Sequence, residues 1–253
     1  MGFMDGVSGK RLESVDLAGA LVRDVDLRDA RFEQVVLTGA RMRGVELEHV
    51  TIDGAVEGLV VNGVEVWPFV EAELDRRYPD RVKMRPTDPA GFRTAWDILE
   101  RLWDETVARA RTLPPELLHE SVDGEWSFIQ TLRHLVFATD AWIGRVILGD
   151  PSPWDPLDLP FDGMADVPGI PRDRTARPSL DEVLALRKDR MAMVRRFVDN
   201  LTVDKLNADT TPVPEPAWPA SISYPVRDVL LLILNEEWQH RLYTERDLDA
   251  LTS

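Results

Sequence analysis

The segment NEEWQHRLYTERDLDAL, near the end of the sequence, contains side chains that could do chemistry. At about 100° per residue, a helix would place Glu236 and His240 on one face, where they can contact each other or share one ion. The same face begins with the apolar residues Val229 and Ile233 and continues to Tyr243. Burying a carboxylate and an imidazole without partners costs several kcal/mol, so we expect a partner at this position.

A third candidate ligand, His134, lies in the segment SFIQTLRHLVFATDAW. Its helical face carries Ala138 and Ala141, whose small side chains leave room beside an imidazole. If the two helices are neighbours, His134, Glu236 and His240 form a set of two histidines and one carboxylate, which suits a divalent transition metal with open coordination positions. The spacing leaves an alternative open, because such a Glu–His pair is more often a surface pair and a single helical histidine is more often structural.

Composition limits the classes of function. The 253-residue chain has a net charge of −15, which disfavours nucleic acids and anionic membranes as partners. It contains no cysteine, which excludes disulfides, thiolate metal ligands and a cysteine nucleophile. Neither a signal peptide nor an apolar stretch of transmembrane length is visible. The sequence therefore predicts a soluble cytoplasmic protein without nucleic-acid or membrane partners.

Four helical segments are expected to position the candidate ligands. They cover residues 90–112, 127–148, 179–201 and 226–251. Ser127 and Ser179 each begin a capping box, which marks the start of the second and third segments. Between these two lies a stretch rich in Pro, Asp and Gly, residues 149–178. We expect it to cross the bundle and help close one end of the pocket, with Trp154 and Phe161 as anchors.

The first part of the chain has a repeat of five residues. From Val15 it reads VDLAG, ALVRD, VDLRD, ARFEQ, VVLTG, ARMRG, VELEH and VTIDG, with Ala or Val in the first place and an apolar residue in the third. This period fits neither a helix nor a strand, but it fits a chain that turns a corner every five residues. The alternative is a set of short strands with accidental spacing. We expect third-place residues such as Leu27, Phe32 and Met42 to be buried in a narrow core.

These patterns divide the chain into three parts. Residues 1–66 are predicted to form the repeat domain and its cap, which contains a turn at Asn62 and Gly63. Residues 67–89 are predicted to form a short linker helix and a charged boundary segment. Residues 90–253 are predicted to form the helical domain.

Both the repeats and the helical part resemble known families. The repeats are similar to the pentapeptide-repeat family, which implies a right-handed quadrilateral β-helix, here of about two coils. Residues 90–251 resemble the DinB-like (DinB/YfiT) superfamily of four-helix bundles with a divalent-metal site. EWSFIQTLRHL matches the W-S-x-x-x-x-L-x-H motif of that superfamily. The resemblances together predict a multidomain α and β fold, in which a short β-helix is followed by a DinB-like four-helix bundle.

The second resemblance implies a function as well as a fold. It implies that His134, Glu236 and His240 bind a divalent metal ion, Zn, Ni or similar. Glu236 stands where the family usually has a histidine, so we expect partial occupancy after purification. The resemblance further implies a metal-dependent enzyme, since some family members use a low-molecular-weight thiol to transfer or isomerise a small-molecule substrate. Tyr243 and Glu237 are the candidates for orienting that substrate; whether the chain is an enzyme stays open.

The alternative function is a non-catalytic binding or assembly protein that uses the repeats as an interaction surface. Some pentapeptide-repeat proteins mimic DNA with a long, strongly acidic rod. Residues 1–60 hold 11 acidic and 7 basic residues, which is too small an excess over two coils for such mimicry. We therefore favour a stabilising or dimerising role for the repeats, and a homodimer as the oligomeric state to test.

Overall fold

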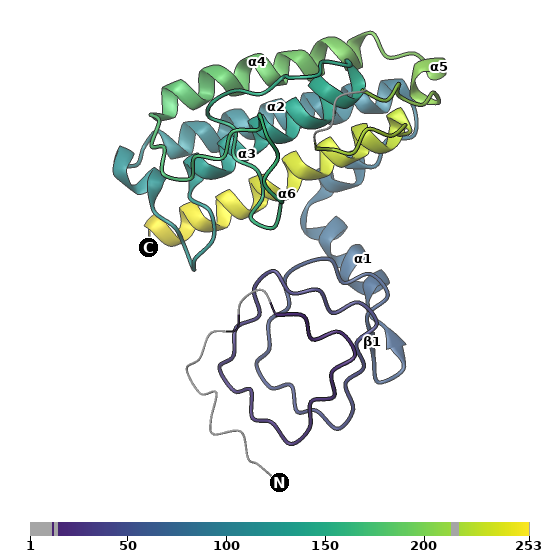
Figure 1. The fold of residues 1–253 in the computed structure, drawn as a ribbon, viewed down its shortest axis with the longest axis vertical. Coiled ribbons are helices and arrows are strands. Elements are labelled where there is room, and N and C mark those ends of the chain that lie inside the picture. Colours follow the sequence, from purple (N-terminus) through teal and green to yellow (C-terminus); the bar gives the residue numbers. More distant parts are fainter. Residues whose placement is uncertain (1–11, 13–14, 214–217, 253) are drawn as a thin grey trace. The chain divides into compact units, whose positions relative to one another are not determined.

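The computed structural model describes residue 12 and residues 15–213 and 218–252. The chain divides into two compact units, Met1–Ala55 and Val56–Ser253. Repeated turns make up the described part of the first unit, and helices make up most of the second (Figure 1). Among the described helices, none combines the length and the apolar composition that a membrane span requires.

The first unit turns a corner at every fifth residue, as the sequence predicts. Each fifth-place residue has a positive φ, and these residues are Gly19, Asp24, Asp29, Gln34, Gly39, Gly44, His49 and Gly54. The corners at Gly19, Asp29 and Gly39 are closed by backbone hydrogen bonds, as from Ala20 N to Leu17 O at 2.9 Å. In Figure 1 the chain of this unit runs in successive coils with regular corners. The described residues before Val60 form no strand, so the β-helix stays a prediction.

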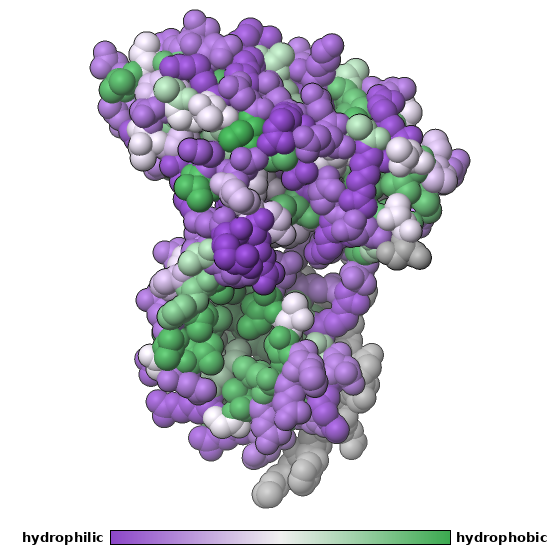
Figure 2. Space-filling view, turned by 180° about the vertical axis from the view of Figure 1, so that it is seen from behind, coloured by the Kyte–Doolittle hydropathy of each residue, from purple (hydrophilic) through white to green (hydrophobic). Residues whose placement is uncertain are grey.

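The prediction that third-place side chains are buried is wrong. Leu27 is 54 % exposed, Phe32 63 % and Met42 59 %. Figure 2 shows hydrophobic residues gathered on the surface of this unit. The physical reason is the small number of coils: with about two, each coil is an end coil, and no side chain has a coil on both sides. The corners form locally, without the enclosed core of a longer stack.

The second unit begins with a hairpin and a short helix. Its first elements are strands β1 (Val60–Val61) and β2 (Val64–Glu65), helix α1 (Trp67–Arg77) and the 3₁₀-helix η1 (Pro79–Met84). The strands pair antiparallel, and Asn62 and Gly63 between them have φ values of 50° and 83°. A type I′ turn requires positive φ at both central residues, so the predicted Asn-Gly turn is confirmed. Helix α1 has Pro68 in its first turn, where the missing N–H is tolerated.

Long helices follow and carry the candidate ligands. In chain order the elements are α2 (Pro89–Ala110), the 3₁₀-helix η2 (Pro115–His119), α3 (Phe128–Thr139), the π-helix η3 (Asp140–Ile147), α4 (Leu180–Asp199), α5 (Val203–Leu206) and α6 (Val226–Thr252). The predicted capping boxes of Ser127 and Ser179 are both formed. The helices agree with the predicted segments, except that the second segment changes from α-helix to π-helix at Asp140.

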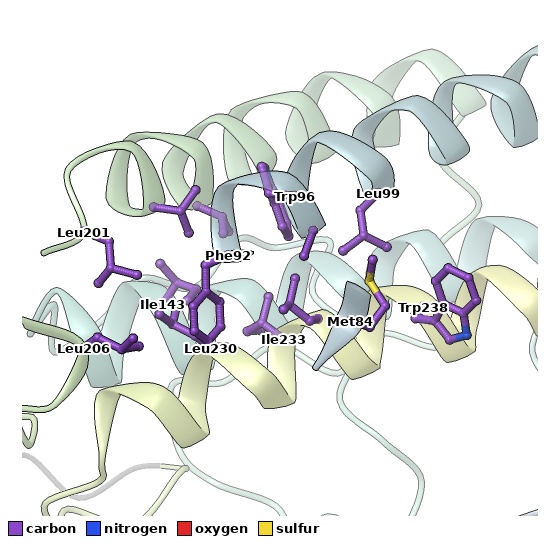
Figure 3. Close-up of a cluster of buried hydrophobic side chains, with 14 of the residues drawn as sticks. Met84, Phe92, Trp96, Leu99, Ile143, Leu201, Leu206, Leu230, Ile233 and Trp238 are labelled. Atoms are coloured by element: carbon purple, nitrogen blue, oxygen red, sulfur yellow. The ribbon is translucent and has the colours of Figure 1, made fainter. Parts of the chain in front are cut away.

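Buried side chains join these helices into one bundle (Figures 1 and 3). One cluster fills the space among α2, η3, α4 and α6; its members include Phe92, Trp96, Leu99, Ile143, Val194, Leu230, Ile233 and Trp238. A second cluster joins α2, α3, α4 and α6 through Trp103, Leu132, Val183 and Leu248. Because each large apolar side chain contributes about 1.5–3 kcal/mol when fully buried, these clusters fix α3 and α6 relative to each other.

Residues 149–178, here called the crossover, connect η3 to α4 without forming a helix or a strand. The Trp154 ring stacks on Phe137 of α3, with ring centroids 5.8 Å apart. Phe161 meets the ring of Trp218 edge-on at 5.5 Å. Both predicted anchors also pack against a cluster that contains Phe137 of α3 and Ala141 of η3. The crossover therefore lies over the part of α3 that contains His134.

Candidate metal centre

Helices α3 and α6 bring His134, Glu236 and His240 together. Glu236 Oε2 lies 3.5 Å from His134 Nε2 and 3.2 Å from His240 Nε2, and one ligand atom from each residue lies within 4.8 Å of the others. Donor atoms around a tetrahedral ion at about 2.0–2.1 Å are about 3.3 Å apart, so these two separations suit a shared divalent ion. The side chains of His134, Glu236 and His240 are 8 %, 31 % and 20 % exposed, which leaves the group open on the α6 side.

The helical period explains why α6 presents two of these groups side by side. Glu236 and His240 are four residues apart, and their face continues from the buried residues Val229 and Ile233. His134 lies in the middle of α3 and is itself buried. The apolar stripe that packs α6 into the bundle therefore also carries the polar pair to its partner on α3.

The backbone of the crossover determines which nitrogen of His134 faces the other two residues. His134 Nδ1 lies 3.0 Å from Leu159 O. A carbonyl oxygen only accepts hydrogen bonds, so Nδ1 carries a hydrogen, and Nε2 is the nitrogen that faces Glu236. An imidazole lone pair and a carboxylate oxygen repel each other unless a proton or a metal ion lies between them. The space between Nε2 of His134 and the Glu236 carboxylate therefore suits a proton or a metal ion.

The Glu236 side chain is an ionised carboxylate. Burial would raise the pKa of Glu236, but hydrogen bonding with the His134 and His240 imidazoles and electrostatic attraction to them lower it to about 2. The carboxylate is therefore ionised throughout the physiological pH range. A permanently charged oxygen between two imidazoles is well suited to hold a divalent cation.

Aromatic rings enclose the two imidazoles. The Trp126 ring lies 4.5 Å from that of His134 and is stacked on that of His240, with centroids 6.0 Å apart. Phe137 lies 6.1 Å from His134, and Tyr243 meets His240 edge-on at 6.0 Å. These rings displace water from around the site, and a lower local dielectric strengthens the electrostatic interactions inside it.

Glu237, the other residue predicted for orienting a substrate, has a different partner. It is 1 % exposed, and Arg187 of α4 donates to its two carboxylate oxygens at 2.8 and 2.6 Å. The structure therefore engages Glu237 in a buried ion pair rather than with His134, Glu236 or His240. Tyr243 is the one of the two candidates that contacts a member of the group.

Two contributors were not among the predicted site residues. Trp126 belongs to the motif EWSFIQTLRHL and precedes His134 by about two helical turns, so its place in the sequence could have suggested a role. Leu159 contributes a backbone carbonyl, for which residue type gives no signal. The first was recognisable from spacing, and the second required the structure.

Comparisons with known proteins identify both units. A family model described as DinB superfamily matches residues 98–244, a range that contains all three candidate ligands. A model described as pentapeptide repeats matches residues 11–55 in eight copies. Neither the comparison with curated proteins nor that with solved structures found a match.

Proposed function

Because the chain belongs to the DinB superfamily and carries pentapeptide repeats, we propose that it is a metal-dependent enzyme whose ion is held by His134, Glu236 and His240. The superfamily binds metal and is often enzymatic. The observation that carries the proposal is the convergence of one ligand atom from each of the three residues, with the Nδ1 hydrogen of His134 already taken by Leu159 O. A cation between His134 Nε2 and the Glu236 carboxylate removes the repulsion between the imidazole lone pair and the carboxylate oxygen.

The donor set indicates the class of metal. The ligands would be Nε2 of His134 and His240 and an oxygen of Glu236. Two imidazoles and one carboxylate suit Zn or Ni, and three protein ligands leave a coordination position for a substrate. Since Glu236 replaces the histidine that is usual in the family, partial occupancy after purification is expected.

The chemistry that a divalent ion supplies when bound is Lewis-acid activation, which lowers the pKa of a thiol or of water. Leu159 O keeps the His134 ring in one orientation, and Trp126 limits access of water to both imidazoles. Tyr243, beside His240, is the candidate for orienting a substrate. A transferase or isomerase that acts on a small molecule with a low-molecular-weight thiol is the reaction class that we propose.

Metal analysis of the purified chain, followed by calorimetric titration with Zn²⁺ and with Ni²⁺, tests the proposal. We expect less than one ion per chain as purified and about one per chain after titration, as three donors can hold one, and no binding by His240→Ala. His49→Ala is the matched control, because His49 is exposed and lies in the other unit. Equal binding by both variants and the wild type would contradict the metal site.

A second function, self-association through the repeats, is favoured by the exposed apolar side chains of the first unit. Large exposed apolar patches mark interaction sites, and a second copy of the chain offers the matching surface. Light scattering after size-exclusion chromatography should give a homodimer that Phe32→Ser shifts toward monomer. Val203→Ser, which removes an exposed apolar side chain from the other unit, should leave the mass unchanged. A monomeric wild type at all concentrations would exclude this function.

A further inference from the structure

A buried arginine of α3 holds the crossover. Arg133 Nε donates to Leu157 O at 2.8 Å. Its Nη1 donates to Ala176 O at 3.2 Å and its Nη2 to Asp173 O at 2.6 Å. Arg133 is 0 % exposed, and these three acceptors are backbone carbonyls rather than carboxylates. One side chain therefore binds an earlier and a later part of the crossover at once.

Placing an arginine here has a cost and a benefit. A guanidinium removed from water loses several kcal/mol of solvation unless its donors are satisfied. The crossover in turn has no helix or sheet to satisfy its buried carbonyls, which need donors. Arg133 meets both needs with three N–H groups of fixed geometry, a pattern that neither lysine nor an apolar residue reproduces.

The part of the crossover that Arg133 holds includes the carbonyl that contacts His134. Leu159 follows Leu157 by two residues, its side chain is fully buried, and its carbonyl oxygen lies 3.0 Å from His134 Nδ1. Asp158 between them is also buried. Arg133 and His134 are consecutive in α3, and their partners Leu157 and Leu159 are only two residues apart in the crossover. A displacement of Leu157 from the guanidinium would therefore also displace Leu159 O from the imidazole.

We propose that Arg133 is a positioning residue of the candidate metal centre: it fixes the Leu159 carbonyl, which keeps the hydrogen of His134 on Nδ1 and leaves Nε2 to bind metal. The inference rests on the proposed function for its metal, whereas the tautomer of His134 can be measured without metal. Groups that orient a ligating histidine typically change metal affinity by about 10–100-fold when they are removed.

Arg145 offers a matched control. It is a buried arginine in η3, and it donates to Pro151 O of the same crossover at 3.1 Å and to Ser221 Oγ at 3.3 Å. Arg133→Lys and Arg145→Lys both keep the positive charge and both remove hydrogen bonds to the crossover. Only the first removes the bond to Leu157 O, two residues before Leu159.

Nitrogen NMR of the imidazoles, without metal, is the first measurement, with His134→Gln used to assign the signals. We expect His134 to carry hydrogen on Nδ1 in the wild type and in Arg145→Lys, and a mixture of tautomers in Arg133→Lys. Titration with Zn²⁺ is the second measurement. The dissociation constant should rise by about 10–100-fold in Arg133→Lys and stay at the wild-type value in Arg145→Lys.

Two results would overturn the proposal. The first is an Arg133→Lys variant that keeps both the tautomer of His134 and the Zn²⁺ affinity. The second is an equal change in the two lysine variants, because an equal change would reflect general loosening of the crossover. If Arg133→Lys does not fold, Arg133→Gln, which still donates to one carbonyl, takes its place with Arg145→Gln as its control. A wild type that binds no Zn²⁺ contradicts the proposed function, and the tautomer of the Arg133 variants still decides the role of Arg133.

Discussion

Asp158 is a carboxylic acid that the fold keeps neutral. It is fully buried, and burial together with the nearby charge of Asp140 raises its pKa to about 8, against a hydrogen bond from Asp155 N that lowers it. Its Oδ1 has no hydrogen-bond partner among the described protein atoms. A charged form at this position would lack the solvation it has in water, so the protonated form is the one that fits the crossover.

This acid should make stability depend on pH. The unfolded chain ionises Asp158 near pH 4, whereas the folded chain ionises it near pH 8. Between these values the unfolded state binds fewer protons, so the free energy of unfolding falls as pH rises. Asp158→Asn removes this titration and should raise the melting temperature more at about pH 8 than at about pH 5, as measured by circular dichroism. Asp150→Asn, at an exposed position of the crossover, is the control, and an equal effect of Asp158→Asn at both pH values would refute the assignment.

Glu237 should be a structural residue rather than a ligand. Glu237→Gln leaves the Arg187 guanidinium buried beside a neutral amide, so it should lower the free energy of unfolding by about 3–5 kcal/mol in denaturant titrations. Zn²⁺ affinity of the folded fraction should not change. Replacing Arg187 and Glu237 together by Met should recover much of the loss, because no buried charge remains. Unchanged stability with lost metal binding would place Glu237 in the site instead.

At the scale of elements, the sequence predicts what depends on neighbours in the chain. Ser127 and Ser179 locate the starts of α3 and α4 because a capping box depends on residues within one turn. The change to π-helix at Asp140 has no such local signal. There the side chain of Asp140 is buried and accepts hydrogen bonds from Arg190 of α4 at 2.6 and 2.9 Å, a contact that exists only in the folded bundle.

The candidate site also has parts that the sequence predicts and parts that only the folded structure determines. The period of α6 predicts that Glu236 and His240 share a face, and residue type makes them candidate ligands. The orientation of His134 depends on Leu159 O, which any residue in that place would provide. The prediction that Phe32 is buried is wrong for a related reason. Burial in a repeat depends on the number of coils and not on the pattern within one coil.

The corners of the repeat unit give an element-scale prediction. Gln34 and His49 adopt φ values of 54° and 57°, a conformation that costs residues with a Cβ about 1–2 kcal/mol. Gln34→Gly should therefore stabilise this unit by about 1 kcal/mol, and Gly39→Ala should destabilise it by a similar amount. Differential scanning calorimetry measures both, with Gln34→Ala as a control near zero. A stabilising Gly39→Ala would contradict the assigned corners.

At the scale of the whole molecule, the division into two units predicts two unfolding transitions. All 8 tryptophans lie after residue 55, so tryptophan fluorescence reports only on the second unit, while calorimetry reports on both. Zn²⁺ should raise the fluorescence-detected transition alone, because a ligand that binds only the folded site stabilises that unit by mass action. Gln34→Gly should shift only the other transition. Coincident transitions by both methods would instead indicate one cooperative molecule.

Every fifth residue of the repeat unit has a left-handed backbone conformation, and this limits which insertions and deletions its gene can accept. An insertion or deletion of five codons, or of a multiple of five, returns Gly, Asp, Gln or His to the corners. A change of any other size brings residues such as Val and Leu into a conformation that β-branched and bulky side chains rarely adopt. The length of this unit can therefore drift between generations only in whole repeats. Duplication and loss of short coding segments therefore become the natural way for it to lengthen or shorten.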